Sequence, residues 1–113
     1  MTLAIIGSRG VSEEYYARFT ELVPLNCTRI VSGGAAGIDA FARRYAAEQG
    51  MDCHEILPDY AAHGRRAPLI RNEAIIEHAD FVVAFWDGKS HGTAYVVARC
   101  VERGIPVKVI MVG

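Results

Sequence analysis

Short apolar runs alternate with amphipathic segments along the whole chain, and this alternation restricts the folds available to it. Five of the runs indicate buried strands, at residues 3–6, 29–32, 53–57, 79–86 and 106–112. The segments between them carry apolar residues at helical spacing and begin near Ser12, Ile38, Pro68 and Thr93. Strands that are apolar on both faces and joined by helices favour a parallel sheet covered on both sides. We therefore expect an α/β fold, a Rossmann-like three-layer sandwich with four helices and a five-stranded parallel sheet of order 3-2-1-4-5.

The composition fits one domain that folds throughout. Of the 113 residues, 51% are hydrophobic and 22% are charged, and neither a low-complexity tract nor a linker-like segment interrupts them. We expect residues 1–113 to form a single domain with one core.

Charge, cysteine content and hydropathy narrow the functional classes. The formal net charge is −1 with no long run of one sign, so general electrostatic attraction to nucleic acid is not indicated. Cys27, Cys53 and Cys100 lack the paired spacing of a zinc site or a disulfide framework and fit a reducing compartment. No stretch approaches the ~20 apolar residues of a membrane span. We expect a cytoplasmic protein without membrane contact, bound metal or a required cofactor.

The loops at one edge of the predicted sheet are the candidate site. In open parallel sheets, ligands bind beyond the carboxyl ends of the strands where the strand order reverses, which here is between the first and fourth strands. The first strand is followed there by Gly7, Ser8 and Arg9. Glycine allows close approach of a ligand, and arginine offers a planar fork of donors to phosphate or carboxylate. Alone, this motif is equally typical of an ordinary turn.

The second strand leads into a loop with almost no side-chain bulk, SGGAAGID, and then into a helix. Backbone N–H groups at such a helix start can bind an anion, and we assign Ser32, Gly33, Gly34 and Gly37 to ligand binding. The loop matches neither the dinucleotide fingerprint nor the ATPase phosphate loop, so a standard NAD dehydrogenase and an ATPase are not supported. Asp39 fits either a ribose contact or simple stabilisation of the helix dipole.

Two further segments complete the candidate site. Arg71 and Asn72 lie near the start of the third helix, after Arg65 and Arg66, for which a solvated helix face is the simpler interpretation. The fourth strand is followed by small and hydroxyl residues at another helix start, Ser90, Gly92 and Thr93. Thr93 also fits a plain helix cap. Tyr60 and Trp86 are candidates for stacking on a base, and Trp86 fits a core position equally well.

Taken in order, GSRG, VSGGAAGID, RNEAII, ADFVVAFWDG and SHGT resemble the SLOG superfamily over nearly all of the 113 residues. This superfamily joins the Rossmann-like domain of the DNA-processing protein DprA, also called Smf, with the LOG phosphoribohydrolases. The chain looks most like the small stand-alone YspA-like members. The resemblance implies a nucleotide-derived ligand whose phosphate is held by the two glycine-containing loops and oriented by Arg9, Arg71 and Asn72.

The chain departs from the LOG enzymes at the position of their catalytic glutamate, which is Val96 here. Valine neither donates nor accepts a proton, so glycosidic cleavage would need a substitute acid or base. Asp39, Asp87 and His91 are the weak candidates for that role.

Three functions follow, in order of preference. The first is binding or sensing of a nucleotide or an NAD- or ADP-ribose-like phosphate ligand. The second is cleavage of a nucleoside phosphate by a LOG-like N-glycosidase. The third is DprA-like binding of single-stranded DNA with help from Arg65 and Arg66, which the acidic net charge and the lack of an aromatic series disfavour.

The helix predicted over residues 91–103 also suggests self-association. Its apolar residues wrap the helix with more surface than one sheet face covers: Tyr95, Val96, Val97, Cys100 and Val101. We expect a homo-oligomer that forms through this helix.

Overall fold

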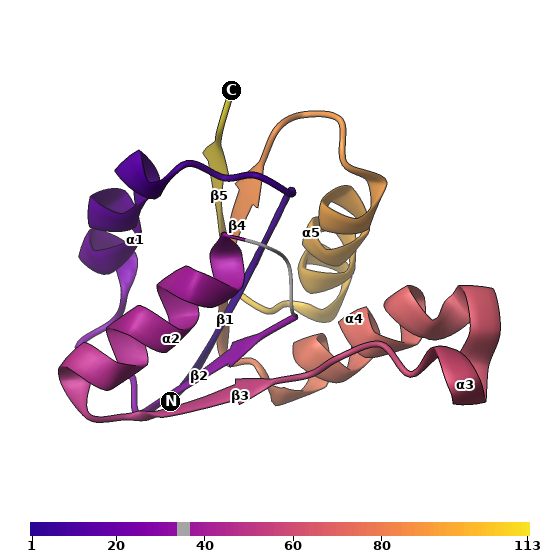
Figure 1. Ribbon diagram of the computed structural model, residues 1–113, viewed down its shortest axis with the longest axis horizontal. Helices are drawn as coiled ribbons and strands as arrows, with labels where there is room; N and C mark the ends of the chain where they lie inside the picture. Colours follow the sequence, from indigo (N-terminus) through magenta and orange to yellow (C-terminus); the bar gives the residue numbers. More distant parts are fainter. Residues whose placement is uncertain (34–36) are drawn as a thin grey trace.

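A computed structural model describes residues 1–33 and 37–113 and contains one five-stranded sheet (Figure 1). The strands are β1 (Thr2–Gly7), β2 (Arg29–Ser32), β3 (Asp52–Glu55), β4 (Phe81–Trp86) and β5 (Val107–Met111). Every neighbouring pair is parallel, and the order is β3-β2-β1-β4-β5. The predicted α/β Rossmann-like fold and strand order are confirmed.

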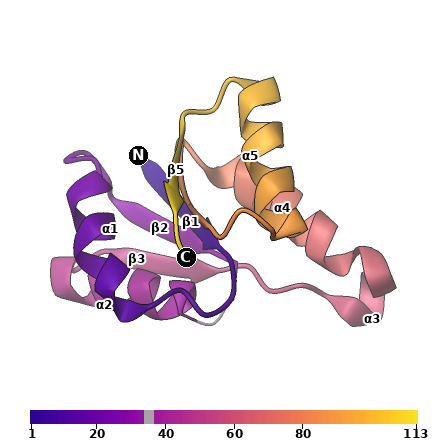
Figure 2. The same cartoon turned by 90° about the horizontal axis from the view of Figure 1, so that it is seen from above.

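Four longer helices cover the two faces of this sheet: α1 (Tyr16–Leu22), α2 (Ile38–Gln49), α4 (Ala67–His78) and α5 (His91–Arg103). Figure 2 shows α1 and α2 on one face and α4 and α5 on the other. The helix ends follow the sequence, since α2 and α5 both stop at a glycine in the left-handed region, Gly50 with φ 66° and Gly104 with φ 70°.

The sheet divides the core into two apolar layers, where the sequence predicted one core. Along β1, Leu3 and Ile5 face the layer beneath α1 and α2, whereas Ala4 and Ile6 face the layer beneath α4 and α5. This follows from the pleat, because successive side chains of a strand point to opposite faces. Phe19, at 0% exposure, packs its ring against Phe41, Tyr45 and Phe85 in the first layer.

The connection between the strand predicted at residues 53–57 and the helix predicted to begin near Pro68 contains regular structure. It holds a one-turn helix, α3 (Tyr60–His63), and a 3-10 turn, η2 (Gly64–Arg66), and a similar turn, η1 (Glu13–Tyr15), precedes α1. Asp59 caps α3 by accepting the N–H of Ala62 at 3.1 Å. Propensity alone does not reveal such a short helix, because a single turn depends on its cap and its neighbours.

Two strand boundaries differ from the prediction by two residues, and the others differ by at most one. β3 stops at Glu55 rather than at residue 57, and Leu57 is exposed. β4 begins at Phe81 rather than at residue 79, because the N–H of Ala79 still donates to the carbonyl of Ile76 and so completes α4.

The two faces of α5 differ in burial. Thr93, Val96 and Cys100 are buried against the sheet, Tyr95 and Val97 are partly buried, and Val101 is 69% exposed. Self-association through this helix stays a prediction. None of the described helices combines the length and the apolar character that a membrane crossing requires.

Candidate functional site

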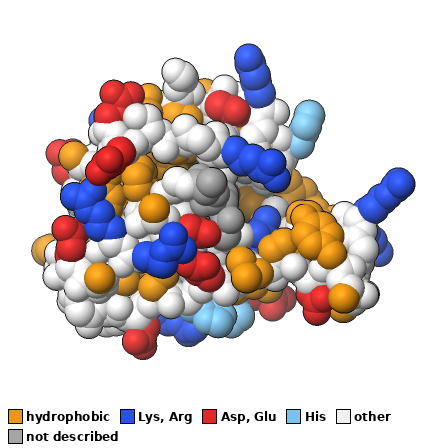
Figure 3. Space-filling view, in the orientation of Figure 1, with side chains coloured by type: hydrophobic (Ala, Val, Ile, Leu, Met, Phe, Trp, Pro, Cys, Tyr) orange, Lys and Arg blue, Asp and Glu red, His pale blue; other side chains and the backbone are white. Residues whose placement is uncertain are grey.

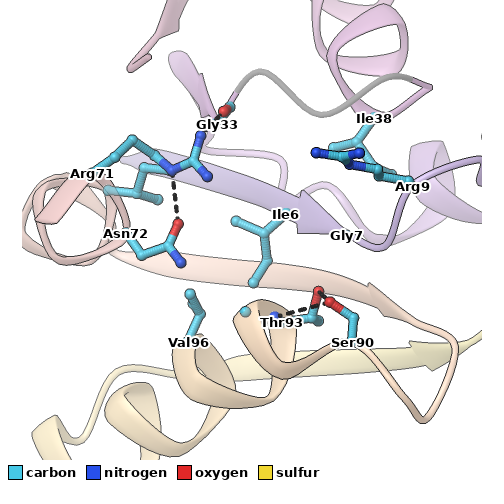
Figure 4. A pocket seen from close by; sticks show the side chains of 12 residues that line it. Ile6, Gly7, Arg9, Gly33, Ile38, Arg71, Asn72, Ser90, Thr93 and Val96 are labelled. Atoms are coloured by element: carbon cyan, nitrogen blue, oxygen red, sulfur yellow. Dashed lines mark hydrogen bonds between the residues drawn. The ribbon is translucent and has the colours of Figure 1, made fainter. Parts of the chain in front are cut away.

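A cavity of about 170 Å3 opens at the carboxyl end of β1. At this point, between β1 and β4, the order in which successive strands are added to the sheet reverses. Its walls come from β1, the start of α2, α4 and the start of α5 (Figure 4), and its lining residues are Ile6, Gly7, Arg9, Gly33, Ile38, Arg71, Asn72, Ile75, Ser90, Gly92, Thr93 and Val96. Its apolar members are buried (Ile6, Ile38, Ile75 and Val96), whereas Arg71 and Asn72 on α4 are half-buried and Arg9 is exposed. The cavity therefore has a hydrophobic floor and a polar, cationic rim.

Arg71 crosses this cavity from α4. Its guanidinium donates to the carbonyl of Gly33 and, at 2.8 Å from Nε, to Oδ1 of Asn72. Both acceptors are neutral groups, so neither cancels the positive charge. Burial lowers the pKa of Arg71, and the Tyr60 phenol and the Asp39 carboxylate act in the opposite direction. The side chain thus presents a partly desolvated cation held by two acceptors.

Arg9 lies on the opposite side of the cavity, on the connection that follows β1, and its side chain is exposed (Figure 4). Gly7, two residues earlier, has a packing role. A Cβ at this position would lie 2.7 Å from Cγ1 of Ile38 and 3.0 Å from the carbonyl oxygen of Phe85. Only glycine lets the end of β1 approach α2 and β4 this closely.

The turn between β4 and α5 is held by its own side chains. The Asp87 carboxylate accepts the N–H groups of Lys89 and Ser90, each at 2.8 Å, and these bonds lower its pKa. The Trp86 indole N–H donates to the carbonyl of Ser90 at 3.0 Å. This network fixes where α5 begins.

Ser90 caps α5, since its Oγ accepts the N–H of Thr93 at 3.4 Å and its hydroxyl donates to Oγ1 of Thr93 at 3.3 Å. The first turn of any helix leaves N–H groups without acceptors inside the helix, and here these belong to His91 and Gly92. They carry the positive end of the helix dipole. The arrangement can bind an anion between the α5 N-terminus and the two arginines.

The sequence pattern of the family described as DNA recombination-mediator protein A matches residues 1–104. The chain belongs to this family. The Gene 61 protein of Mycobacterium phage D29 is 34% identical over 84 residues, which are 69% of this chain and 67% of that protein. No solved structure gives a significant match.

Membership in the DNA recombination-mediator protein A family supports the DprA branch of the resemblance inferred from the sequence motifs. The finer assignment to small stand-alone YspA-like members stays a prediction.

Eight of the predicted ligand-binding residues line the cavity at the end of β1: Gly7, Arg9, Gly33, Arg71, Asn72, Ser90, Gly92 and Thr93. Gly34, also predicted, lies outside the described residues. The other four predicted residues do not line this cavity and have structural contacts instead: Ser8, Ser32, Gly37 and Asp39.

Ser8 and Ser32 are buried, and their hydroxyl groups hold neighbouring segments together. Ser8 Oγ accepts the N–H of Asp87 at 3.1 Å, which ties the end of β1 to the turn after β4. The Ser32 hydroxyl donates to Oδ1 of Asp39 at 2.8 Å, which ties the end of β2 to α2.

Gly37 lies away from the cavity, with φ 89°, and a Cβ there would lie 3.0 Å from the carbonyl oxygen of Val11. It borders a second hollow, together with Arg44, between α2 and the segment that precedes α1.

The candidate acids and bases do not line the cavity. Asp39 is buried at 8% exposure, Asp87 accepts the bonds of its turn, and His91 is exposed at the start of α5. Val96, at 1% exposure, lines the cavity wall, and it is the position at which the resemblance to the LOG enzymes would predict glutamate. Among the described residues, no three His, Cys, Asp or Glu side chains gather as metal ligands would.

Sequence reasoning did not assign the apolar floor of the cavity. Ile6, Ile38 and Ile75 line it, yet each also fills a core position. Their periodicity predicted only burial, because residues at the open end of an apolar layer follow the same pattern as those deep within it.

Proposed function

We propose that this DNA recombination-mediator family domain binds a phosphate-bearing nucleotide ligand at the cavity between β1, α4 and α5. The observation that carries the proposal is the convergence of Arg9, Arg71 and the α5 N-terminus on one cavity. Each of these groups favours an anion, and phosphate suits both the planar guanidinium and the backbone N–H groups.

The size of the cavity indicates which part of the ligand it holds. At about 170 Å3 it is smaller than the ~300 Å3 at which pockets for drug-sized ligands begin. A phosphate and part of a sugar therefore occupy it, and the base lies outside. Micromolar affinity corresponds to about 8 kcal/mol, which two arginines and a helix terminus are able to supply after the costs of association.

Calorimetric titration with AMP, ADP, ADP-ribose and NAD tests this proposal. We expect at least one to bind with micromolar affinity. Arg71→Gln should weaken that affinity about 10- to 100-fold, because a hydrogen bond to a charged group contributes about 1.5–3 kcal/mol. Arg9→Gln should weaken it in the same direction.

Arg18→Gln is the matched control, because Arg18 is exposed on α1, away from the cavity lining. Its affinity should equal that of the unaltered protein. Binding no tighter than millimolar across all four compounds would contradict the proposal, as would equal losses in Arg71→Gln and Arg18→Gln.

Family membership favours single-stranded DNA as a second candidate ligand. A DNA strand would present its phosphates to the same arginines and to Arg65 and Arg66, which lie on η2. Affinity for an oligonucleotide should then fall steeply with salt, and Arg65→Gln with Arg66→Gln should flatten that dependence. Absent or salt-independent binding would exclude this candidate.

Glycosidic cleavage is the third candidate, and it would require an acid or base near the cavity. An assay for free base or ribose phosphate from AMP tests it, with Asp39→Asn, Asp87→Asn and His91→Gln as variants. Release that all three variants leave unchanged would reject these residues as catalysts.

A further inference from the structure

Exposed hydrophobic side chains lie beside the cavity, over the segment that joins β3 to α3 (Figure 3). Leu57 is 63% exposed and Tyr60 is 62% exposed. Among the large hydrophobic side chains that are exposed in the described residues, Tyr60 is the one with an aromatic ring. Because the Tyr60 ring is exposed, packing in the core does not explain why an aromatic residue lies next to a cationic cavity.

The turn that carries Tyr60 is fixed in place. The Asp59 carboxylate accepts the N–H of Ala62, and its carbonyl accepts the N–H of His63 at 3.0 Å. α3 packs against α4, the helix from which Arg71 enters the cavity. Tyr60 is therefore presented at a defined position relative to Arg71.

The place of Tyr60 agrees with the electrostatics of Arg71. In its ionised form the Tyr60 phenol raises the pKa of Arg71, against the larger effect of burial, which lowers it. Trp86, the other candidate for stacking on a base, has a structural role instead. It is half-buried, and its indole N–H donates to the carbonyl of Ser90.

We propose that the base of the bound nucleotide stacks on the ring of Tyr60, outside the cavity that holds the phosphate. This inference rests on the proposed function. A base carries a π-face that stacks on an aromatic ring whatever its hydrogen-bonding edge. The site then recognises nucleotides as a class and selects weakly among bases.

The experiment compares AMP with ribose 5-phosphate, which lacks the base, in calorimetric titrations. The unaltered protein should bind AMP more tightly than ribose 5-phosphate. Tyr60→Ala should weaken AMP binding about 10-fold, within the range for loss of one base-stacking contact, and leave ribose 5-phosphate binding unchanged. Tyr60→Phe should retain the affinity for AMP, because it keeps the ring.

A second readout follows the stacking itself. In Tyr60→Trp, AMP should quench the new indole fluorescence and ribose 5-phosphate should not. Leu25→Ala is the control for removing an exposed apolar side chain, since Leu25 is fully exposed on the connection between α1 and β2. Its AMP affinity should not change.

The outcomes separate the two proposals. If neither compound binds the unaltered protein, and ADP, ADP-ribose and NAD do not bind either, the proposed function fails. If both bind with equal affinity, or if Tyr60→Ala weakens both to the same extent, the phosphate site stands and the stacking role of Tyr60 is wrong.

Discussion

Arg71 is the residue on which the candidate site depends most. It links α4 to the end of β2 through the carbonyl of Gly33, and Asn72 orients its Nε. A Cβ on Gly33 would approach its guanidinium to 3.3 Å, so the absence of a side chain there gives Arg71 its place. The arginine is thus held at the cavity before any ligand arrives.

The stability of the protein should respond differently to alanine at two glycines of the site. Gly7→Ala places a methyl group against Ile38 and the Phe85 carbonyl, and should lower the free energy of unfolding by about 1–3 kcal/mol. Gly92→Ala meets only Asn72, at 4.0 Å, and should change the free energy of unfolding by less than about 0.5 kcal/mol. Urea denaturation measures both values.

Gly92→Ala should nevertheless weaken AMP binding severalfold, because Gly92 lines the cavity and the added methyl group occupies its space. A Gly7→Ala protein as stable as the original would show that β1 does not end against α2 as described. A Gly92→Ala protein with unchanged AMP affinity would place the ligand elsewhere.

A charged cluster joins the two helices α4 and α5. Glu73 on α4 accepts bonds from the Tyr95 hydroxyl and, at 2.8 Å, from Arg99 Nε on α5. These two donors lower the pKa of Glu73, Arg99 most strongly. The cluster sets how the arginine-bearing helix lies against the helix whose N-terminus faces the cavity.

This cluster should make stability depend on pH. Because the folded-state pKa of Glu73 is lowered, its contribution is fully present above the ordinary glutamate pKa of about 4.3 and is lost as pH falls below it. Glu73→Gln should lower the free energy of unfolding at pH 7 by up to about 1 kcal/mol and reduce its fall between pH 5 and 3.

Urea denaturation across that pH range measures the effect, and Glu77→Gln, at an exposed position of the same helix, is the control. An unfolding profile of Glu73→Gln parallel to that of the original protein would contradict the account of this cluster.

For the whole molecule, much of the fold was predictable because its signals are local. The apolar run of β2 and the glycines after α2 and α5 mark boundaries that the structure keeps. The strand order followed from general rules for parallel sheets. The one-turn helix α3 was not predictable, because it depends on the Asp59 cap and on contact with α4.

The candidate site was predictable in outline only. Glycine, arginine and hydroxyl residues after β1, β2 and β4 indicated which loops meet, and their spacing could not separate lining residues from supporting ones. Ser8 and Ser32 are examples. Each follows or ends a strand at the edge of the sheet that carries the site, but the hydroxyl of Ser8 bonds to Asp87 and that of Ser32 bonds to Asp39. Only the three-dimensional path of the chain distinguishes these roles.

A crystal structure of the protein with bound AMP tests the central claim most directly. We predict the phosphate within hydrogen-bonding distance of the Arg71 guanidinium and of the backbone N–H of Gly92, between β1 and the start of α5. An AMP phosphate bound at any other place on the molecule, with the Arg71 cavity filled by water or side chains, would contradict it.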